Sequence, residues 1–180
     1  MDTSSPEITL SQRLARLKLM AFDVDGVLTD GRIYYTDNGA EMKAFHTLDG
    51  LGIKMLSDAG LKIGLITARR SAVVERRARD LGVHFCFQGA SAKHVVFGEM
   101  LDELKLAPEQ AGYVGDDLVD LPVLVRAGFA ATVPTAPAGV KTRCHYVTSA
   151  HGGHGAAREV CEMILRAQGV YDKLLAEYCQ

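Results

Sequence analysis

The amino-acid sequence predicts an α/β fold: a three-layer, doubly wound parallel sheet covered by helices on both faces. Short apolar runs suited to buried strands alternate along the chain with segments whose apolar residues recur at helical spacing. Such close alternation favours parallel strands joined by crossover helices. The sequence contains no internal repeat, no low-complexity tract and no linker long enough to divide it. We therefore expect one domain over residues 1–180.

Composition is that of an ordinary globular protein. The 180 residues are 48% hydrophobic and 23% charged, and their formal net charge is −2. A chain of this length and apolar content can bury a substantial core. Its nearly neutral charge gives no reason to expect nucleic acid or an anionic membrane as a partner.

The cysteines and the N-terminal residues favour a cytoplasmic protein. The four cysteines are scattered without a C-x-x-C pair, which argues against a disulfide framework or zinc site and fits a reduced cytosol. Residues 1–16 lack the continuous apolar segment of a signal peptide. No run approaches the roughly 18 apolar residues that a membrane span requires.

The first third of the chain predicts a lead-in segment, a buried strand and a hairpin. A short helix is expected within residues 7–16 of the lead-in (1–16), followed by a strand over 17–22. Two further strands are expected within 32–45, at 32–36 and 41–45, and Asn38-Gly39 between them is a strong hairpin signal. This β-hairpin flap is too small for a cap domain. It could cover a sheet edge, or it could contact other subunits.

The rest of the chain continues the alternation of helices and strands. Leucines and methionines at helical spacing after residue 47 predict a helix that ends at Gly60, and Ser71 is expected to cap another. The other expected elements are strands at 61–66, 83–87, 111–115, 129–133 and 145–147, and helices near 97–104, 118–125 and 156–167. The last helix follows a glycine-rich turn within the segment 150–180.

Two carboxylates, Asp23 and Asp25, follow the first expected strand, and Gly26 ends that strand. We expect them to project from its carboxyl end, where open α/β sheets bind ligands. Two like charges so close repel each other unless a cation lies between them or one is protonated. A hard divalent ion with oxygen ligands, such as Mg²⁺, is the natural partner.

Further polar residues lie at other predicted strand ends: Thr67, Lys93 and the pair Asp116-Asp117. Each alone has a structural explanation, as a buried threonine, a solvated lysine or a helix cap. With the first two aspartates they suit phosphoryl transfer, in which cations and donors must meet the charge on the equatorial oxygens. In this interpretation Asp23 is the nucleophile and Asp25 the proton donor and acceptor, and the reaction passes through an aspartyl-phosphate.

These motifs resemble those of the haloacid dehalogenase-like phosphatases. The four matching segments are D-x-D-G-V-L-T-D-G from Asp23, Leu65-Ile66-Thr67-Ala68-Arg69, Gln88-Gly89 with Lys93, and Gly115 to Pro122. The hairpin, Asp49-Gly50 and the segment 152–160 resemble the small capless branch, and the resemblance extends from Leu17 to Gln168. It implies a Rossmann-like sheet without a cap domain.

The resemblance also implies roles for individual residues. Asp23, Asp25 and Asp116 would bind Mg²⁺, Asp25 through its backbone carbonyl, with Asp117 and Asp120 supporting the metal site. Thr67 and Lys93 would hold the phosphoryl group. The sugar contacts would come from Asp25, Lys93 and a segment and basic residues that match the family: His46, Thr47, Leu48, Asp49, Gly50, Lys54, Arg69 and Arg77. His46, Lys54 and Ala68 replace the asparagine, arginine and glycine usual in the family.

Arginines cluster around one predicted helix, at 69, 70, 76, 77 and 79. For Arg70, Arg76 and Arg79 a solvated helix face is the simplest interpretation. Arg69 follows Thr67 by two residues, beside the expected site, and Arg77 lies two helical turns further. An arginine fork suits the carboxylate of a sugar acid, so we favour substrate contacts for both.

The type enzyme of the capless branch hydrolyses 3-deoxy-D-manno-octulosonate 8-phosphate in lipopolysaccharide precursor synthesis, and the resemblance implies this activity. It also implies a homotetramer in which the glycine-rich tail reaches a neighbour's active site, with His151 and His154 as loop residues rather than metal ligands. A nine-carbon sialic-type sugar acid 9-phosphate is an alternative substrate. A receiver-like signalling domain and an idle oligomerisation domain are alternatives of another class. The order of the acidic motifs and the intact set of polar residues argue against these two.

Overall fold

The computed structural model describes residues 8–179, and its centre is a six-stranded parallel sheet. The strand order is β5-β4-β1-β6-β7-β8, so β1 is internal and the chain winds outward from it in both directions. This is the predicted doubly wound arrangement. The strands are β1 (Leu19–Phe22), β4 (Lys62–Thr67), β5 (Phe85–Gln88), β6 (Ala111–Val114), β7 (Phe129–Thr132) and β8 (Tyr146–Val147).

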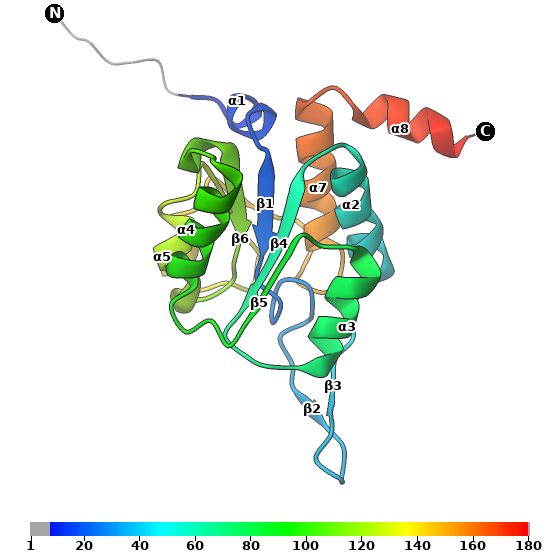
Figure 1. The fold of residues 1–180 in the computed structure, drawn as a ribbon, viewed down its shortest axis with the longest axis vertical. Helices are drawn as coiled ribbons and strands as arrows, with labels where there is room; N and C mark the ends of the chain where they lie inside the picture. Colours follow the sequence, from blue (N-terminus) through cyan, green and yellow to red (C-terminus); the bar gives the residue numbers. More distant parts are fainter. Residues whose placement is uncertain (1–7, 180) are drawn as a thin grey trace, which may run out of the picture.

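Helices cover both faces of the sheet and complete the three layers (Figure 1). One face is covered by α1 (Leu10–Ala15), α2 (Thr47–Asp58), α3 (Ala72–Leu81) and α7 (Ala156–Ala167). The other is covered by α4 (Lys93–Leu104), α5 (Leu121–Leu124) and α6 (Ala138–Lys141). The last helix, α8 (Tyr171–Tyr178), follows α7 and buries none of its residues.

The central strand explains why the sheet needs both layers. Met20 and Phe22 belong to the core under α2 and α7, whereas Leu19 and Ala21 belong to the core under α4 and α5. All four are fully buried. A strand buried on both faces is a continuous apolar run, and the buried side chain of Phe22 alone stabilises the fold by about 1.5–3 kcal/mol.

Strand pairing brings the polar strand ends together at one edge. Phe22 of β1 lies opposite Leu65 of β4 and Val114 of β6, all in parallel register. The residues that follow these three positions therefore emerge at the carboxyl edge of the sheet, where ligands of open α/β sheets bind. Asp23, Thr67 and Asp116 are among them.

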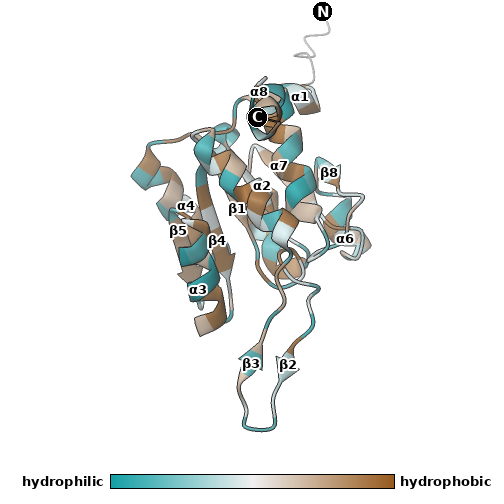
Figure 2. Ribbon diagram, turned by 90° about the vertical axis from the view of Figure 1, so that its right-hand side faces the viewer, coloured by the Kyte–Doolittle hydropathy of each residue, from teal (hydrophilic) through white to brown (hydrophobic). Residues whose placement is uncertain are grey.

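The predicted hairpin forms between β1 and α2 and extends away from the sheet at its carboxyl edge (Figures 1 and 2). Its strands, β2 (Tyr34–Tyr35) and β3 (Glu41–Met42), are shorter than the predicted 32–36 and 41–45. Only the pairs Tyr34–Met42 and Tyr35–Glu41 are in register. Gly39 has φ of 82°, which is why the Asn-Gly turn can close.

Several other elements differ from the prediction. Residues 118–125 form a 3₁₀ turn, η2 (Leu118–Asp120), and the short α5 instead of one helix, because Pro122 has no N–H for a continuous ladder. Ser71 precedes α3, but its side chain makes no capping bond. The lead-in helix is limited to α1, and residue 7 lies outside the described residues. Helices α6 and α8 were not predicted.

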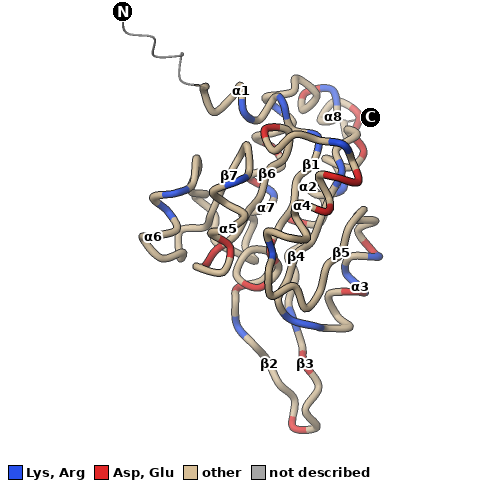
Figure 3. The backbone as a smooth tube through the Cα atoms, turned by 60° about the vertical axis from the view of Figure 1, so that its left-hand side comes forward, with Lys and Arg blue, Asp and Glu red and all other residues tan. Residues whose placement is uncertain are grey.

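Lysine and arginine are interspersed with aspartate and glutamate along the backbone in Figure 3. Within residues 8–179, no helix has both the length and the apolar character needed to cross a bilayer.

Candidate active site

A cavity of about 260 Å³ lies at the carboxyl edge of the sheet. It brings together the catalytic and metal-binding residues predicted from four separate motifs. The lining residues are Asp23, Asp25, Gly31, Thr67, Ala68, Arg69, Lys93, Asp116, Asp117 and Val119. The predicted strand-end aspartates, threonine and lysine therefore share one site.

The loop after β1 is a tight turn that places the two aspartates differently. The backbone N–H of Asp23 donates to the Val114 carbonyl at 2.8 Å, so the first carboxylate still belongs to the sheet edge. Thr29 closes the turn, because its hydroxyl oxygen accepts from the N–H groups of Gly26 (3.3 Å) and Gly31 (3.2 Å). Thr29 was not predicted as a site residue, although its place in the D-G-V-L-T-D-G motif could have indicated this role.

Gly26 is required by its backbone angle and by its neighbour. Its φ is 93°, in the region that favours glycine. A Cβ atom there would lie 2.0 Å from Oδ2 of Asp116. Glycine thus lets the loop after β1 approach the carboxylate that follows β6.

Asp120 is fully buried and accepts four hydrogen bonds. Its Oδ1 accepts from the Lys93 ammonium and the Tyr113 hydroxyl, both at 2.7 Å. Its Oδ2 accepts from the backbone N–H groups of Asp116 (3.0 Å) and Asp117 (3.1 Å). These four bonds use all the acceptor positions of the carboxylate. Asp120 therefore holds the Lys93 and Tyr113 side chains and the backbone at Asp116 and Asp117 in place.

Lys93 is the first residue of α4, and its side chain is only 2% exposed. Its ammonium lies 2.8 Å from Oδ1 of Asp23 as well as 2.7 Å from Oδ1 of Asp120. Burial lowers the pKa of Lys93, but the charges of the two aspartates outweigh this effect and leave it above its ordinary value. Lys93 is therefore a fixed cation facing the cavity.

The acidic residues carry more charge than Lys93 can balance. Burial, and then the neighbouring Asp120, raise the pKa of Asp23 to about 8, although Lys93 opposes this shift. Burial and Asp120 also raise the pKa of Asp116 to about 6. When all three carboxylates are ionised, they and the one ammonium leave two negative charges, the charge that one divalent cation neutralises.

Oxygen atoms of Asp23, Asp116 and Asp120 lie within 4.8 Å of one another, close enough to hold a metal ion. An all-oxygen donor set suits Mg²⁺. Because Asp120 is saturated by four donors, we assign the direct ligands to Asp23 and Asp116 and a supporting role to Asp120. Asp117 is exposed and caps η2 by accepting from the Leu118 N–H at 2.7 Å. Metal ligation by the Asp25 carbonyl stays a prediction.

Asp25 lies nearer the mouth of the cavity, with 21% of its side chain exposed. The Thr67 hydroxyl is 3.5 Å from its Oδ2 and also accepts from the Arg69 N–H at 3.2 Å. The closest cation is Lys43, whose ammonium forms an ion pair with the Asp25 carboxylate. Lys43 was not predicted, because nothing in the local pattern of the hairpin indicates this contact.

The predicted sugar contacts divide into two groups. Asp25, Arg69 and Lys93 line the cavity, whereas the segment 46–50, Lys54 and Arg77 do not. Lys54 is exposed on α2. Arg77 donates to the His46 carbonyl at 3.3 Å and stacks on Phe45. The segment 46–50 therefore forms the start of α2, Arg77 contacts it from α3, and Lys54 lies further along α2. Contact of these residues with substrate stays a prediction.

His46 and Asp49 have local structural roles. Nδ1 of His46 accepts from the Leu48 N–H at 3.2 Å and caps α2, a bond that the family's asparagine could also make. Asp49 is buried and accepts from the N–H groups of Arg158 (2.8 Å) and Gly155 (3.3 Å). It caps α7 from another helix, which links the Asp49-Gly50 motif to the glycine-rich turn.

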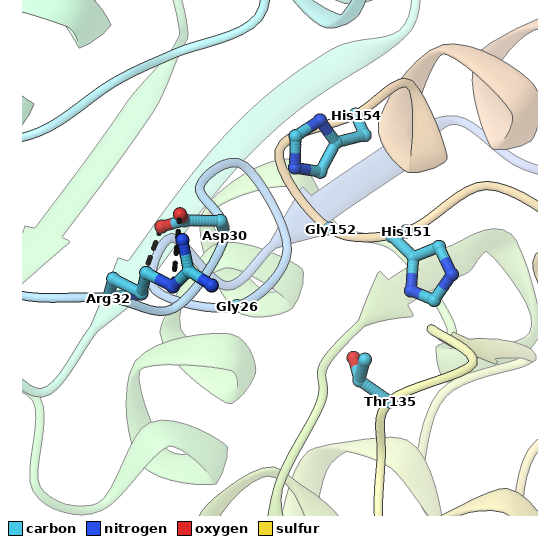
Figure 4. A pocket seen from close by; sticks show the side chains of 7 residues that line it. All are labelled: Gly26, Asp30, Arg32, Thr135, His151, Gly152 and His154. Atoms are coloured by element: carbon cyan, nitrogen blue, oxygen red, sulfur yellow. Dashed lines mark hydrogen bonds and ion pairs between the residues drawn. The ribbon is translucent and has the colours of Figure 1, made fainter.

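A second cavity of about 360 Å³ adjoins the loop after β1 (Figure 4). His151 and His154 of the glycine-rich turn border it, with Asp30 and Arg32 on the opposite side. In the described part of the chain, neither histidine belongs to a group of side chains close enough to hold a metal. Both histidines lie in the loop that precedes α7.

No family profile matches the sequence. The chain is similar to the 3-deoxy-D-manno-octulosonate 8-phosphate phosphatase of Yersinia pestis, which is 45% identical over 163 residues, 91% of this chain and 86% of that protein. This chain belongs to the 3-deoxy-D-manno-octulosonate 8-phosphate phosphatase family. The Haemophilus influenzae enzyme of the same name is 43% identical over 89% of each chain.

Solved structures agree with this assignment. The Moraxella catarrhalis 3-deoxy-D-manno-octulosonate 8-phosphate phosphatase, crystallised with magnesium, phosphate and the sugar acid, is 40% identical, with a TM-score of 0.92 over 93% of this chain and 97% of that one. A Legionella pneumophila protein described as a putative hydrolase of the haloacid dehalogenase superfamily is 35% identical, with a TM-score of 0.91 over 94% and 93%. The predicted family and fold are confirmed.

The acidic site predicts that Mg²⁺ stabilises this phosphatase. At 100 times its dissociation constant, Mg²⁺ should add about 2.7 kcal/mol to the free energy of unfolding. Asp116→Asn should lose most of this gain, because it removes one of the two proposed carboxylate ligands. Thermal unfolding with chelator and with added Mg²⁺ measures the effect.

The matched control is Asp102→Asn, an exposed position on α4 away from the cavity. It should keep the wild-type response to Mg²⁺. A wild-type response in Asp116→Asn would show that this residue is not a ligand.

Proposed function

We propose that this protein is a Mg²⁺-dependent phosphatase that hydrolyses 3-deoxy-D-manno-octulosonate 8-phosphate to the sugar acid and inorganic phosphate, a step in lipopolysaccharide precursor synthesis. The observation that carries the proposal is the shared cavity of Asp23, Asp25, Thr67, Lys93 and Asp116, in a chain whose relatives are phosphatases of this name. Phosphate monoester hydrolysis needs a nucleophile, an acid/base and cations around the phosphoryl group. This set supplies each of them.

In the first step, Asp23 attacks phosphorus and the bond to the sugar oxygen breaks. Lys93 fixes the nucleophilic carboxylate at 2.8 Å, so little reorientation is required on substrate binding. Asp25 donates a proton to the departing sugar oxygen. The products of this step are the free sugar acid and a phosphoryl group on Asp23.

In the second step, Asp25 takes a proton from a water molecule that attacks the phosphoryl group on Asp23. Inorganic phosphate leaves and the Asp23 carboxylate is restored. The Lys93 ammonium and the Thr67 hydroxyl belong to residues that line the cavity, where they would meet the phosphoryl oxygens in both steps. When bound, Mg²⁺ supplies Lewis-acid stabilisation of the charge on those oxygens.

Arg69 is the best-placed group for the sugar acid. It borders the cavity, and its Nε is buried without a hydrogen-bond acceptor among the described residues. A guanidinium with a free N–H suits a carboxylate, which it can bind through two parallel hydrogen bonds. The substrate's carboxylate supplies such an acceptor.

The proposal includes a homotetramer in which neighbouring chains complete the active site. Two observations support it: the segment 46–50 and Arg77 lie outside the cavity of their own chain, and the projecting hairpin exposes apolar side chains. These are Ile33, Tyr34, Tyr35 and Met42. Exposed apolar residues grouped on one projection favour protein contacts. Light scattering should give the mass of four chains, and a monomer that is fully active would contradict this arrangement.

The proposal treats residues 1–180 as one hydrolase domain that acts in the cytoplasm. All four cysteines are free, as expected in a reducing compartment. Cell fractionation that recovers the enzyme outside the cytoplasm would contradict the location.

Phosphate release distinguishes the possible substrates. We expect kcat/KM for 3-deoxy-D-manno-octulosonate 8-phosphate to exceed that for a nine-carbon sialic-type 9-phosphate, and activity to require Mg²⁺. Asp23→Asn should lower kcat at least about 10³-fold because it removes the nucleophile. Asp102→Asn, on the exposed face of α4, is the control and should retain activity.

A higher kcat/KM for the nine-carbon ester would identify that compound as the substrate. Full Mg²⁺-dependent turnover by Asp23→Asn would show that the nucleophile is another residue.

A further inference from the structure

One lysine of the hairpin contacts an aspartate of the active site. Lys43 directly follows β3, and its side chain is only 1% exposed although its backbone is open to solvent. The ammonium forms an ion pair with the Asp25 carboxylate and lies 2.8 Å from Oε1 of Glu41. Ordering and burying a lysine side chain costs rotamer entropy, so this placement needs compensating contacts.

The same part of the hairpin also contacts the loop after β4. Oε2 of Glu41 lies 3.6 Å from Nη2 of Arg69, and the Tyr35 hydroxyl is 3.3 Å from the same nitrogen. Charges therefore alternate along one chain of ion pairs, Asp25–Lys43–Glu41–Arg69, which we call the hairpin clasp. It joins the hairpin to the loops that follow two neighbouring strands.

We propose that Lys43 is a positioning residue that holds the Asp25 carboxylate in the orientation needed for proton transfer to the leaving oxygen. The inference rests on the proposed role of Asp25 as acid/base. It makes the hairpin part of the catalytic apparatus, in addition to any contact between subunits.

The contacts of Asp25 explain why it needs this support. Its side chain is partly exposed at the cavity mouth, and Thr67 approaches it only to 3.5 Å. In the described part of the chain, the one ion pair of Asp25 is the pair with Lys43. Asp23, in contrast, is fixed by Lys93. Each aspartate of the D-x-D motif therefore has its own lysine, one from α4 and one from the hairpin.

The leaving group provides a readout that separates positioning from general structural damage. The sugar oxygen of an alkyl phosphate is strongly basic and needs a proton as it departs, whereas p-nitrophenolate is a stable anion and does not. The rate to compare is that of aspartyl-phosphate formation, measured by rapid acid quench. Hydrolysis of the intermediate is common to both substrates and also uses Asp25.

Lys43→Met should slow phosphoenzyme formation from the sugar phosphate about 10²-fold, the lower end of typical general-acid effects. Formation from p-nitrophenyl phosphate should change less than about threefold, since that step needs no general acid. Lys43→Arg should recover part of the lost rate. Lys62→Met, an exposed lysine at the start of β4, is the matched control and should react normally.

Asp25→Asn in the same assay distinguishes the possible failures. If Asp25→Asn shows the selective loss and Lys43→Met does not, the positioning role of Lys43 is wrong. If Asp25→Asn shows no selective loss, the acid/base assignment fails and the inference fails with it. Equal slowing of both substrates by Lys43→Met would mean that Lys43 only anchors the hairpin. Lys43→Gln replaces Lys43→Met if the latter does not fold.

Discussion

The geometry of the site depends on the buried Asp120 carboxylate. It receives Lys93, Tyr113 and two backbone N–H groups, and so ties α4 and β6 to the turn that carries Asp116. Breaking a buried charged contact costs about 3–5 kcal/mol, because the remaining partner is left uncompensated. The fully satisfied network makes this a rigid support. The proposed nucleophile, the fixed cation and one proposed metal ligand are all held through a residue that need not touch substrate.

The two aspartates of the D-x-D motif lie in different environments, which fits their different tasks. Asp23, the proposed nucleophile, is 5% exposed and is held at the sheet edge beside Lys93. Asp25 lies further out, directly before Gly26 in the turn after β1, where a proton can pass to a leaving group or from water. Since no cap domain follows β1, the hairpin clasp supplies part of the order that a cap could otherwise give.

Much of this arrangement could be predicted because each motif is tied to a strand end. An apolar strand followed by Asp23, Thr67 or Asp116 places those side chains at one edge once the strands are parallel. The missed contacts join residues that are distant in sequence. Lys43 meets Asp25 only after the hairpin folds back, and Asp49 caps α7 from more than 100 residues away. Periodicity and local propensity contain no information on such pairs. Tyr113 was predicted only to lie in a strand, yet its hydroxyl donates to Asp120 and completes the hydrogen bonds of that carboxylate.

The most direct test of the central claim is the rate of aspartyl-phosphate formation in Asp120→Asn, measured by rapid acid quench with labelled substrate and Mg²⁺. Asparagine keeps the volume but has one acceptor oxygen in place of two, so it cannot hold Lys93 and the Asp116 turn together. We predict a rate at least about 10²-fold below wild type, equivalent to about 3 kcal/mol, in a protein that remains folded. Labelling of folded Asp120→Asn at the wild-type rate would contradict the account.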